Sequence, residues 1–154
     1  MSKSVVTSSF KIDSKVKQVV AGLRQETLKS AAVAGGEVIR GNAKVNVNQT
    51  FSKSHGDAGL AGTIQVVVAE STMSGCVVDV GPTAIHGRIR ELGGIIKPVF
   101  AKMLSWINDA GERVFAKQVT VVGKPYLAPA ITDHHPEIKA AVGEQIRLGI
   151  ERSL

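Results

Sequence analysis

The chain has a single cysteine, Cys76, few aromatic residues and no long apolar run. One cysteine excludes a framework of internal disulfides and is typical of a protein made in a reducing compartment. Aromatic residues are 4% of the 154, so the core has to be built from Val, Ile, Leu and Ala. No apolar run approaches the roughly 20 residues that cross a bilayer, and the first residues lack the apolar stretch of a secretory signal. We therefore expect one domain, assembled in the cytoplasm and without membrane contact.

Motifs for catalysis are also missing from the sequence. It contains neither a Gly-x-Ser-x-Gly nucleophile motif nor a glycine-rich phosphate loop followed by Lys-Ser or Lys-Thr. His86 precedes Glu91 by five residues and Asp79 ends a predicted strand, but no nucleophile accompanies them. The adjacent His134 and His135 suggest a metal site, yet neighbouring side chains on a helix diverge by about a third of a turn. We predict no enzyme activity, no catalytic residue, no cofactor and no bound metal.

Charge leaves one alternative open. Nineteen basic and thirteen acidic residues give a formal net charge of +6. An excess of this size is compatible with nucleic acid or with an acidic protein partner. The basic residues are scattered from Lys3 to Arg152, and aromatic residues are not interleaved with them as a platform for single strands requires. A basic DNA-binding module therefore stays an alternative, with an affinity that would fall steeply with salt.

Helical periodicity marks both ends of the chain. After a flexible N-terminal arm (1–11), apolar residues recur at spacings of three and four over 13–42, which predicts a long helix. Gly35-Gly36 predicts a bend or break within it. A long loop rich in Asn, Ser and Gly follows at 46–62.

The C-terminal helix has the clearest start signals. Thr132 or Asp133 is expected to cap it, and Pro136 and Glu137 suit its first turn. One apolar face then runs almost to Leu154.

Between these helices lie two predicted hairpins. Runs of β-branched residues at 63–69 and 76–80 predict the first, which Gly81-Pro82 ends. A short helix over 83–92 separates it from the second hairpin.

The second hairpin has strands at 95–99 and 103–107, a turn at 108–111 and a return strand at 113–122. The order of elements predicts an α+β fold. A single domain (1–154) would contain an antiparallel sheet with a projecting hairpin, packed by a long N-terminal and a C-terminal helix.

Three segments form the most specific pattern in the sequence: 90–98 (Arg-Glu-Leu-Gly-Gly-Ile-Ile-Lys-Pro), 101–104 (Ala-Lys-Met-Leu) and 123–130 (Gly-Lys-Pro-Tyr-Leu-Ala-Pro-Ala). Their order and spacing resemble the tail-completion, or head–tail joining, family of long-tailed double-stranded DNA phages. They are also similar to the virion morphogenesis proteins of Mu-type phages. The resemblance covers about residues 80–150. Ile96 departs from it, because a small or hydroxyl residue often precedes the Lys-Pro in the family.

The resemblance implies a structural protein of the virion neck or tail end. Its members act as several copies around the tail axis, typically a six-fold ring, and meet other neck and tail proteins such as a head-completion protein, a tail terminator or the tail tube. Passing contact with genomic DNA would give the basic charge a use. A tail terminator or a minor tail protein is the alternative that this pattern does not separate.

Two groups of residues are candidates for specific roles. Pro125 and Pro129 are expected to hold their neighbours in an extended, presented segment. The second hairpin and the 46–62 loop are expected to touch neighbouring subunits. The candidate contact residues are Arg88, Arg90, Glu91, Lys97, Trp106, Tyr126 and Leu127. The candidate turn-forming residues are Gly93, Gly94, Pro98, Pro125 and Pro129.

Overall fold

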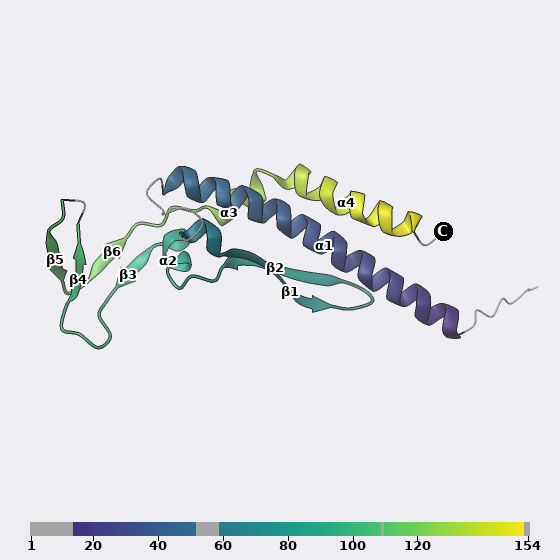
Figure 1. Ribbon diagram of the computed structural model, residues 1–154, viewed down its shortest axis with the longest axis horizontal. Helices are drawn as coiled ribbons and strands as arrows, with labels where there is room; N and C mark the ends of the chain where they lie inside the picture. Colours follow the sequence, from purple (N-terminus) through teal and green to yellow (C-terminus); the bar gives the residue numbers. More distant parts are fainter. Residues whose placement is uncertain (1–13, 52–58, 109, 153–154) are drawn as a thin grey trace, which may run out of the picture.

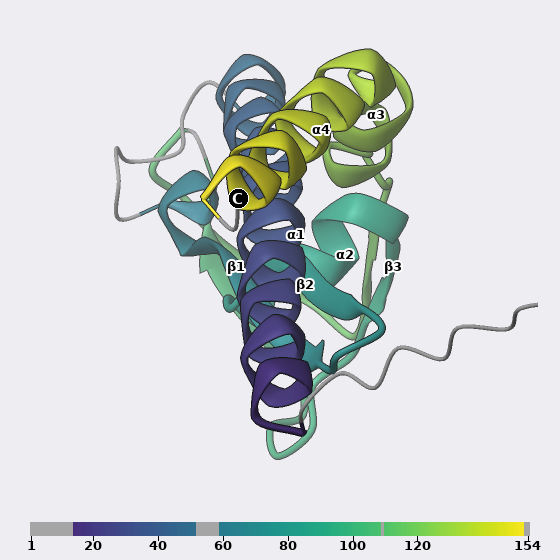
Figure 2. The ribbon, with the colours of Figure 1, turned by 90° about the vertical axis from the view of Figure 1, so that its right-hand side faces the viewer.

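The fold is organised along one long helix. A computed structural model describes residues 14–51, 59–108 and 110–152. Helix α1 (Ser14–Thr50) forms the axis, and α4 (His135–Glu151) runs antiparallel along one side of it (Figure 1). A β-hairpin packs against α1 on another side (Figure 2). The predicted mixture of antiparallel strands with long N-terminal and C-terminal helices is confirmed.

Helix α1 does not break at its glycine pair, so that prediction was wrong. A Cβ on Gly35 would lie 2.9 Å from Val142 of α4, and one on Gly36 would lie 2.7 Å from Val66. The two glycines therefore let α4 and the hairpin approach the helix closely. Tertiary packing outweighs the roughly 1 kcal/mol by which each glycine disfavours a helix.

The predicted 46–62 loop is partly helical. Helix α1 continues to Thr50, and a 3₁₀ turn, η2 (Leu60–Thr63), precedes the first strand. Residues 52–58 and the predicted N-terminal arm (1–11) lie outside the described residues.

The first hairpin is confirmed. β1 (Ile64–Ser71) pairs antiparallel with β2 (Cys76–Pro82), with an irregularity between Val68 and Glu70. The Thr72 hydroxyl oxygen accepts a hydrogen bond from the Gly75 amide and closes the turn. Pro82 is the last residue of β2, as its missing donor predicts.

The second hairpin is split into two short ribbons. β3 (Gly94–Ile96) pairs with β6 (Val119–Val121), and β4 (Leu104–Ile107) pairs with β5 (Arg113–Ala116). Ile96 opposes Val119 and Leu104 opposes Ala116, so residues 97–103 face only residues 117–118. The excess residues form a loop out of the ribbon. We call residues 94–124 the β-arm and residues 97–103 the arm loop.

The β-arm projects beyond the end of α1 at which Thr50 lies (Figure 1). Asn108 holds its far turn: its side-chain oxygen accepts hydrogen bonds from the amides of Ala110 (3.0 Å) and Glu112 (2.9 Å).

Two short helices connect the β-arm to the rest. α2 (Gly87–Leu92) enters it and α3 (Leu127–Thr132) leaves it. The prediction of an extended segment through Pro129 was wrong, because α3 begins at Leu127. Proline is tolerated there, since first-turn amides have no acceptor within a helix.

The start of α4 differs in one detail from the prediction. Its N-cap residue is His134, and neither Thr132 nor Asp133 caps it. The Thr132 hydroxyl donates instead to the Ala128 carbonyl and to the Asp133 carboxylate. Pro136 and Glu137 do lie in the first turn.

The core is small and lies where α1, η2 and α3 meet. Its buried members are Ala43, Val47, Leu60, Ala61, Ile64, Tyr126 and Ala130. All are aliphatic except Tyr126, which agrees with the scarcity of aromatic residues. None of the helices described is long and apolar enough to span a membrane.

A pair of glycines on α4 tests how closely the helices pack. A Cβ on Gly149 would lie 2.8 Å from the Thr27 Cβ of α1, whereas one on Gly143 meets nothing within 4 Å. We expect Gly149→Ala to lower the free energy of unfolding by about 1–3 kcal/mol through overpacking. Gly143→Ala should raise it by about 0.5–1 kcal/mol through helix propensity. Urea unfolding measures both, and equal effects of the two substitutions would contradict the packing.

Candidate functional site

Glu91 joins two segments that are far apart in the sequence. From the last turn of α2, its carboxylate accepts hydrogen bonds from three successive amides at the start of α3. Oε2 accepts from Tyr126 (2.7 Å) and Leu127 (3.0 Å), and Oε1 accepts from Ala128 (3.1 Å). The first amides of a helix have no partner within it and carry partial positive charge. Glu91 therefore caps α3 from 35 residues away.

Tyr126 fills the space between α1, α2 and α3. Its side chain is completely buried. The phenol donates a hydrogen bond to the Gly87 carbonyl (3.3 Å), and the ring packs edge-on against Phe51 with centroids 6.5 Å apart. Asn46 of α1 donates to the Tyr126 carbonyl (3.0 Å). This one residue thus connects the end of the long helix to both short helices.

Two glycines allow the backbones that enter and leave the β-arm to touch. Gly93 has a positive φ of 74°, which side chains disfavour. A Cβ on it would lie 2.6 Å from the Gly123 amide nitrogen, and a Cβ on Gly123 would lie 2.6 Å from the Gly93 nitrogen. Beside them the Lys124 amide donates to the Arg90 carbonyl (2.8 Å).

These contacts form one attachment point, which we call the joint: Gly87, Glu91, Gly93, Gly123 and Tyr126. It draws on two of the three segments that carry the phage resemblance. The third, 101–104, lies in the β-arm that the joint holds. The joint therefore fixes the direction in which the β-arm leaves the rest of the molecule.

The β-arm exposes much apolar surface. Half of the large apolar side chains found exposed in the described part of the chain belong to it. They are Ile95, Ile96, Val99, Phe100, Met103, Trp106, Ile107, Phe115 and Val122. Exposed apolar patches of this kind mark sites of protein–protein contact. Five basic residues and two acidic ones lie among them.

The structure brings four of the seven predicted contact residues together. Arg88, Glu91, Tyr126 and Leu127 line a hollow of about 270 Å³ beside the joint. Tyr126 is fully buried, so its assignment to an intermolecular contact was wrong, and it is a core residue. The Glu91 carboxylate is engaged within the chain by three amides. Leu127 is half-buried and its backbone is helical rather than extended.

The three remaining predicted contact residues, and Arg88 of the hollow, are accessible. Arg88, Lys97 and Trp106 are exposed, and Trp106 retains 41% of its accessible surface. Arg90 is exposed as well, with its guanidinium carbon 5.2 Å from the centre of the Phe51 ring. That distance is within the range of a cation–π contact.

The predicted turn residues lie where the chain changes direction. Gly93 and Gly94 both have positive φ, at 74° and 150°. Pro98 lies in the arm loop and Pro125 just precedes Tyr126. Pro129, in contrast, is a residue of α3.

Val99 and Phe100 were not predicted to be contact residues. Phe100 is fully exposed and Val99 retains 83% of its accessible surface. In the sequence, an apolar pair between Pro98 and Lys102 could have indicated a contact site. The same pair is equally typical of a strand. The loop that presents the pair depends on the register of the two ribbons.

The candidate acid–base and metal residues lie in three places: Asp79 on β2, His86 and Glu91 at α2, and His134 and His135 at the start of α4. In the ranges that the structure describes, no group of three or more His, Cys, Asp or Glu side chains is placed to hold a metal ion. His134 Nδ1 lies 3.2 Å from a Glu137 carboxylate oxygen, and hydrogen bonding to His134 is the main cause that lowers the pKa of Glu137. His135 is exposed.

The joint predicts a specific alkaline transition. Burial, and secondly the negative charge of Glu91, raise the pKa of Tyr126 from 10.0 to about 12. Unfolded Tyr126 would lose its proton near pH 10, while the folded chain holds it until about pH 12. Stability should therefore fall by about 1.4 kcal/mol per pH unit between these values.

Tyr126 is the only tyrosine, so tyrosinate absorbance reports on it alone. Tyr126→Phe should abolish this fall in stability between pH 10 and pH 12. An absorbance midpoint at pH 10 in the folded protein would contradict the burial.

Comparison with protein-family models, with curated proteins and with solved structures finds no match to this chain.

Proposed function

We propose that this protein is a structural subunit of a long-tailed phage virion that completes the tail and joins it to the head. It acts as a ring of subunits at the neck. The observation that carries the proposal is the β-arm: the segments that resemble the joining family either form it or attach it. Its exposed apolar surface is of the kind that partner proteins cover.

The joint supports this role because it gives the β-arm a fixed orientation. An assembly contact gains affinity when its surface is ordered before binding, since less conformational entropy is lost. Three amides held by one carboxylate, a buried phenol and two touching backbones are rigid features. A subunit that must meet several neighbours in register benefits from such an attachment.

The charge of the β-arm is compatible with either kind of neighbour. Along the β-arm, the apolar residues are interspersed with Lys97, Lys102, Arg113, Lys117 and Lys124, and with the acidic Glu112. Charged groups at the edge of an apolar contact mainly set orientation and association rate. The same positive charge would avoid repulsion of the DNA phosphates as the genome passes. A tail terminator or minor tail protein would use the same surface on different neighbours.

Electron microscopy of particles made without this protein tests the proposal. Deleting the gene from its phage or prophage should leave full heads and tails unjoined, and added purified protein should restore joining. Tails of aberrant length on joined particles would favour the terminator role instead. Normal infectious virions would contradict any virion role, and a steep loss of DNA affinity with salt would then favour the DNA-binding alternative.

A further inference from the structure

The β1–β2 hairpin has one face that packs on α1 and one that points away from it. A Cβ on Gly36 of α1 would lie 2.7 Å from Val66 and 3.4 Å from Val78, so these valines belong to the inner face. Because side chains alternate along a strand, their neighbours point outward. We call the outward residues the hairpin face. They are Gln65, Val67, Glu70, Val77 and Asp79, and all five are exposed.

The hairpin face is acidic in a chain that is basic overall. Val67 pairs with Asp79 and Val77 pairs with Glu70, so each of the two valines lies opposite a carboxylate. The sequence has no lysine or arginine between Lys53 and Arg88, so the hairpin supplies no such positive charge of its own. Both valines retain more than half of their accessible surface. The face therefore offers a partner apolar contacts and negative charge together.

The β4–β5 ribbon has a face with the opposite charge. Ile107 pairs with Arg113, and Ser105 pairs with Phe115. These two pairs are separated by one other pair, so the four side chains share one face, which we call the arm face. Ile107 and Phe115 retain 65% and 59% of their accessible surface, and Arg113 is exposed beside them. Five basic and two acidic residues make the whole β-arm positive.

The ribbon would gain stability from a second sheet. In the described part of the chain β4 and β5 pair only with each other, and they lie beyond the end of α1 (Figure 1). A two-stranded ribbon with no packed face is marginally stable in water. Sheets cover one another by packing face to face, about 10 Å apart.

We propose that the arm face of one subunit packs on the hairpin face of a second copy of the same chain. The apolar side chains of the two faces would bury one another, and Arg113 would lie among the carboxylates of the hairpin face. The contact deepens the proposed ring by naming the surfaces through which its subunits meet, and it rests on the proposed function for that setting. Self-association itself can be measured without any virion.

Complementary charge identifies a second copy as the occupant. Every subunit carries a positive arm face and a negative hairpin face, and opposite charges beside an apolar contact steer association and fix its register. The two faces cannot meet within one chain, because the hairpin and the β-arm extend to opposite sides of α2 (Figure 1). DNA would match the charge of the arm face, but it would leave the hairpin face without a partner.

The arm face and the hairpin face are different surfaces, so the contact is head-to-tail. Contacts of this type generate a closed ring when the rotation between subunits fits, and an open filament when it does not. Each subunit of a ring would use both faces, one toward each neighbour.

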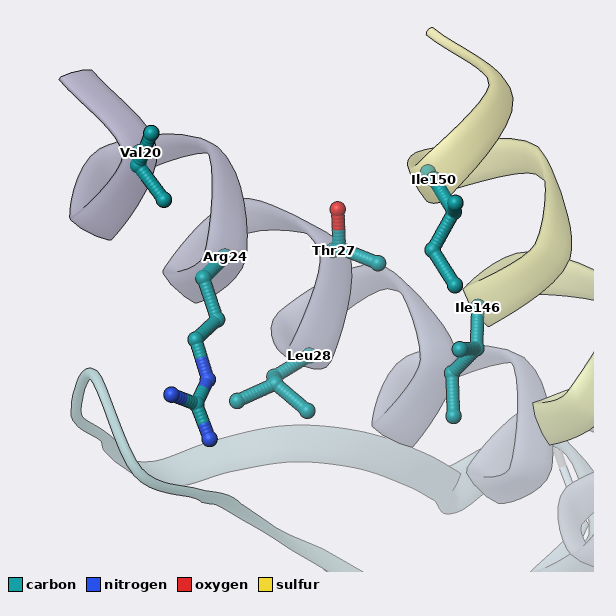
Figure 3. Close-up of a pocket in the computed structure, with 7 residues that line it drawn as sticks. Val20, Arg24, Thr27, Leu28, Ile146 and Ile150 are labelled. Carbon is teal, nitrogen blue, oxygen red and sulfur yellow. The ribbon is translucent and has the colours of Figure 1, made fainter. Parts of the chain in front are cut away.

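Substitutions at the two faces test the contact in solution. Phe115→Asp and Val67→Asp should each weaken self-association by about tenfold or more, as measured by sedimentation equilibrium. Ile85→Asp is a control at an exposed residue outside both faces. Val20→Asp is a second control, because Val20 lines a separate apolar hollow between α1 and α4 (Figure 3). The controls should change the dissociation constant by no more than about threefold.

Mixing the two variants tests the head-to-tail geometry. Val67→Asp protein keeps its arm face and Phe115→Asp protein keeps its hairpin face, so one intact contact can form between them. The mixture should contain dimers that neither variant forms alone, and no larger assemblies. Circular dichroism of each variant establishes that it is folded.

A charge exchange tests whether Arg113 meets the carboxylates directly. Arg113→Glu and Asp79→Arg should each weaken self-association by about fivefold or more, and the double variant should recover to within about twofold of wild type. Lys139→Glu makes the same change of charge on α4, outside both faces, and should have little effect. A purely structural role of either residue would give no recovery.

Wild-type protein that stays monomeric up to its solubility limit would overturn the proposal. Unchanged self-association of Phe115→Asp and Val67→Asp, or a double charge variant no better than the single ones, would do the same. If Arg113→Glu weakened DNA binding but left self-association intact, the arm face would bind nucleic acid, and the proposal would again be overturned. The joining role is decided separately, by the particles made without the protein.

Discussion

Tyr126→Ala is expected to lower the free energy of unfolding by about 3–5 kcal/mol, as large-to-small substitutions of buried aromatic residues do. The side chain is fully buried and is the largest in the core. Its removal would open a cavity where the end of α1 meets α2 and α3. Tyr126 is the one aromatic member of the buried core cluster in the described part of the chain, and Phe51 packs against it from the edge of that cluster. Thermal and urea unfolding measure the effect.

Tyr126→Phe is the control that separates the ring from its hydroxyl. It removes only the hydrogen bond to the Gly87 carbonyl and should lower the free energy of unfolding by about 1 kcal/mol. A loss of less than 1 kcal/mol for Tyr126→Ala would show that the residue is not part of the core.

Glu91→Ala should have the second largest effect, about 2–3 kcal/mol, because hydrogen bonds to charged groups are the stronger ones. Three amides at the start of α3 would lose their acceptor at once. Water can replace part of the loss, since Ala128 is exposed. The effect should also be local: hydrogen exchange at Tyr126, Leu127 and Ala128 should accelerate before exchange in α1 does.

Glu91→Gln tests the same contacts with the shape retained. Its single side-chain oxygen can serve the amides of Tyr126 and Leu127, which now share Oε2, but not that of Ala128. We expect an intermediate loss. If Glu91→Ala left both stability and amide exchange unchanged, the joint would not depend on this carboxylate, and Glu91 would be free to serve as a contact residue.

Periodicity in the sequence was sufficient to predict the elements that pack in a regular way. The apolar periodicity of 13–42, the β-branched runs of 63–69 and 76–80 and the periodicity near the C-terminus are local patterns, and the structure contains the long helix, the hairpin and the second helix that they predict. Gly35-Gly36 misled because the benefit of a glycine depends on what approaches it. Those neighbours, Val142 and Val66, are distant in the sequence. No local pattern shows that another element will pack into the space beside a glycine.

Local sequence patterns also fail to predict the role of Glu91 in the joint. Glu91 is an acidic residue near the end of a short exposed helix, and locally it has the features of a contact residue. Only the fold brings the start of α3 to its carboxylate.

Tyr126 and Phe100 have similar local sequences but opposite exposure. Both are single aromatic residues close after a proline, and nothing local tells which is buried. The phenol of Tyr126 reaches the Gly87 carbonyl, whereas Phe100 lies in residues 97–103, which have almost no opposite strand to pack on.

Head–tail joining in vitro tests the central claim most directly. Heads and tails from a strain that lacks the gene would be mixed with purified protein, and joined particles would be counted by electron microscopy. We predict that the wild-type protein and Ile85→Asp restore joining, while folded Phe100→Asp does not. Restoration by Phe100→Asp at the wild-type level, or joined infectious particles without any added protein, would contradict the account of the β-arm as the assembly surface of a neck subunit.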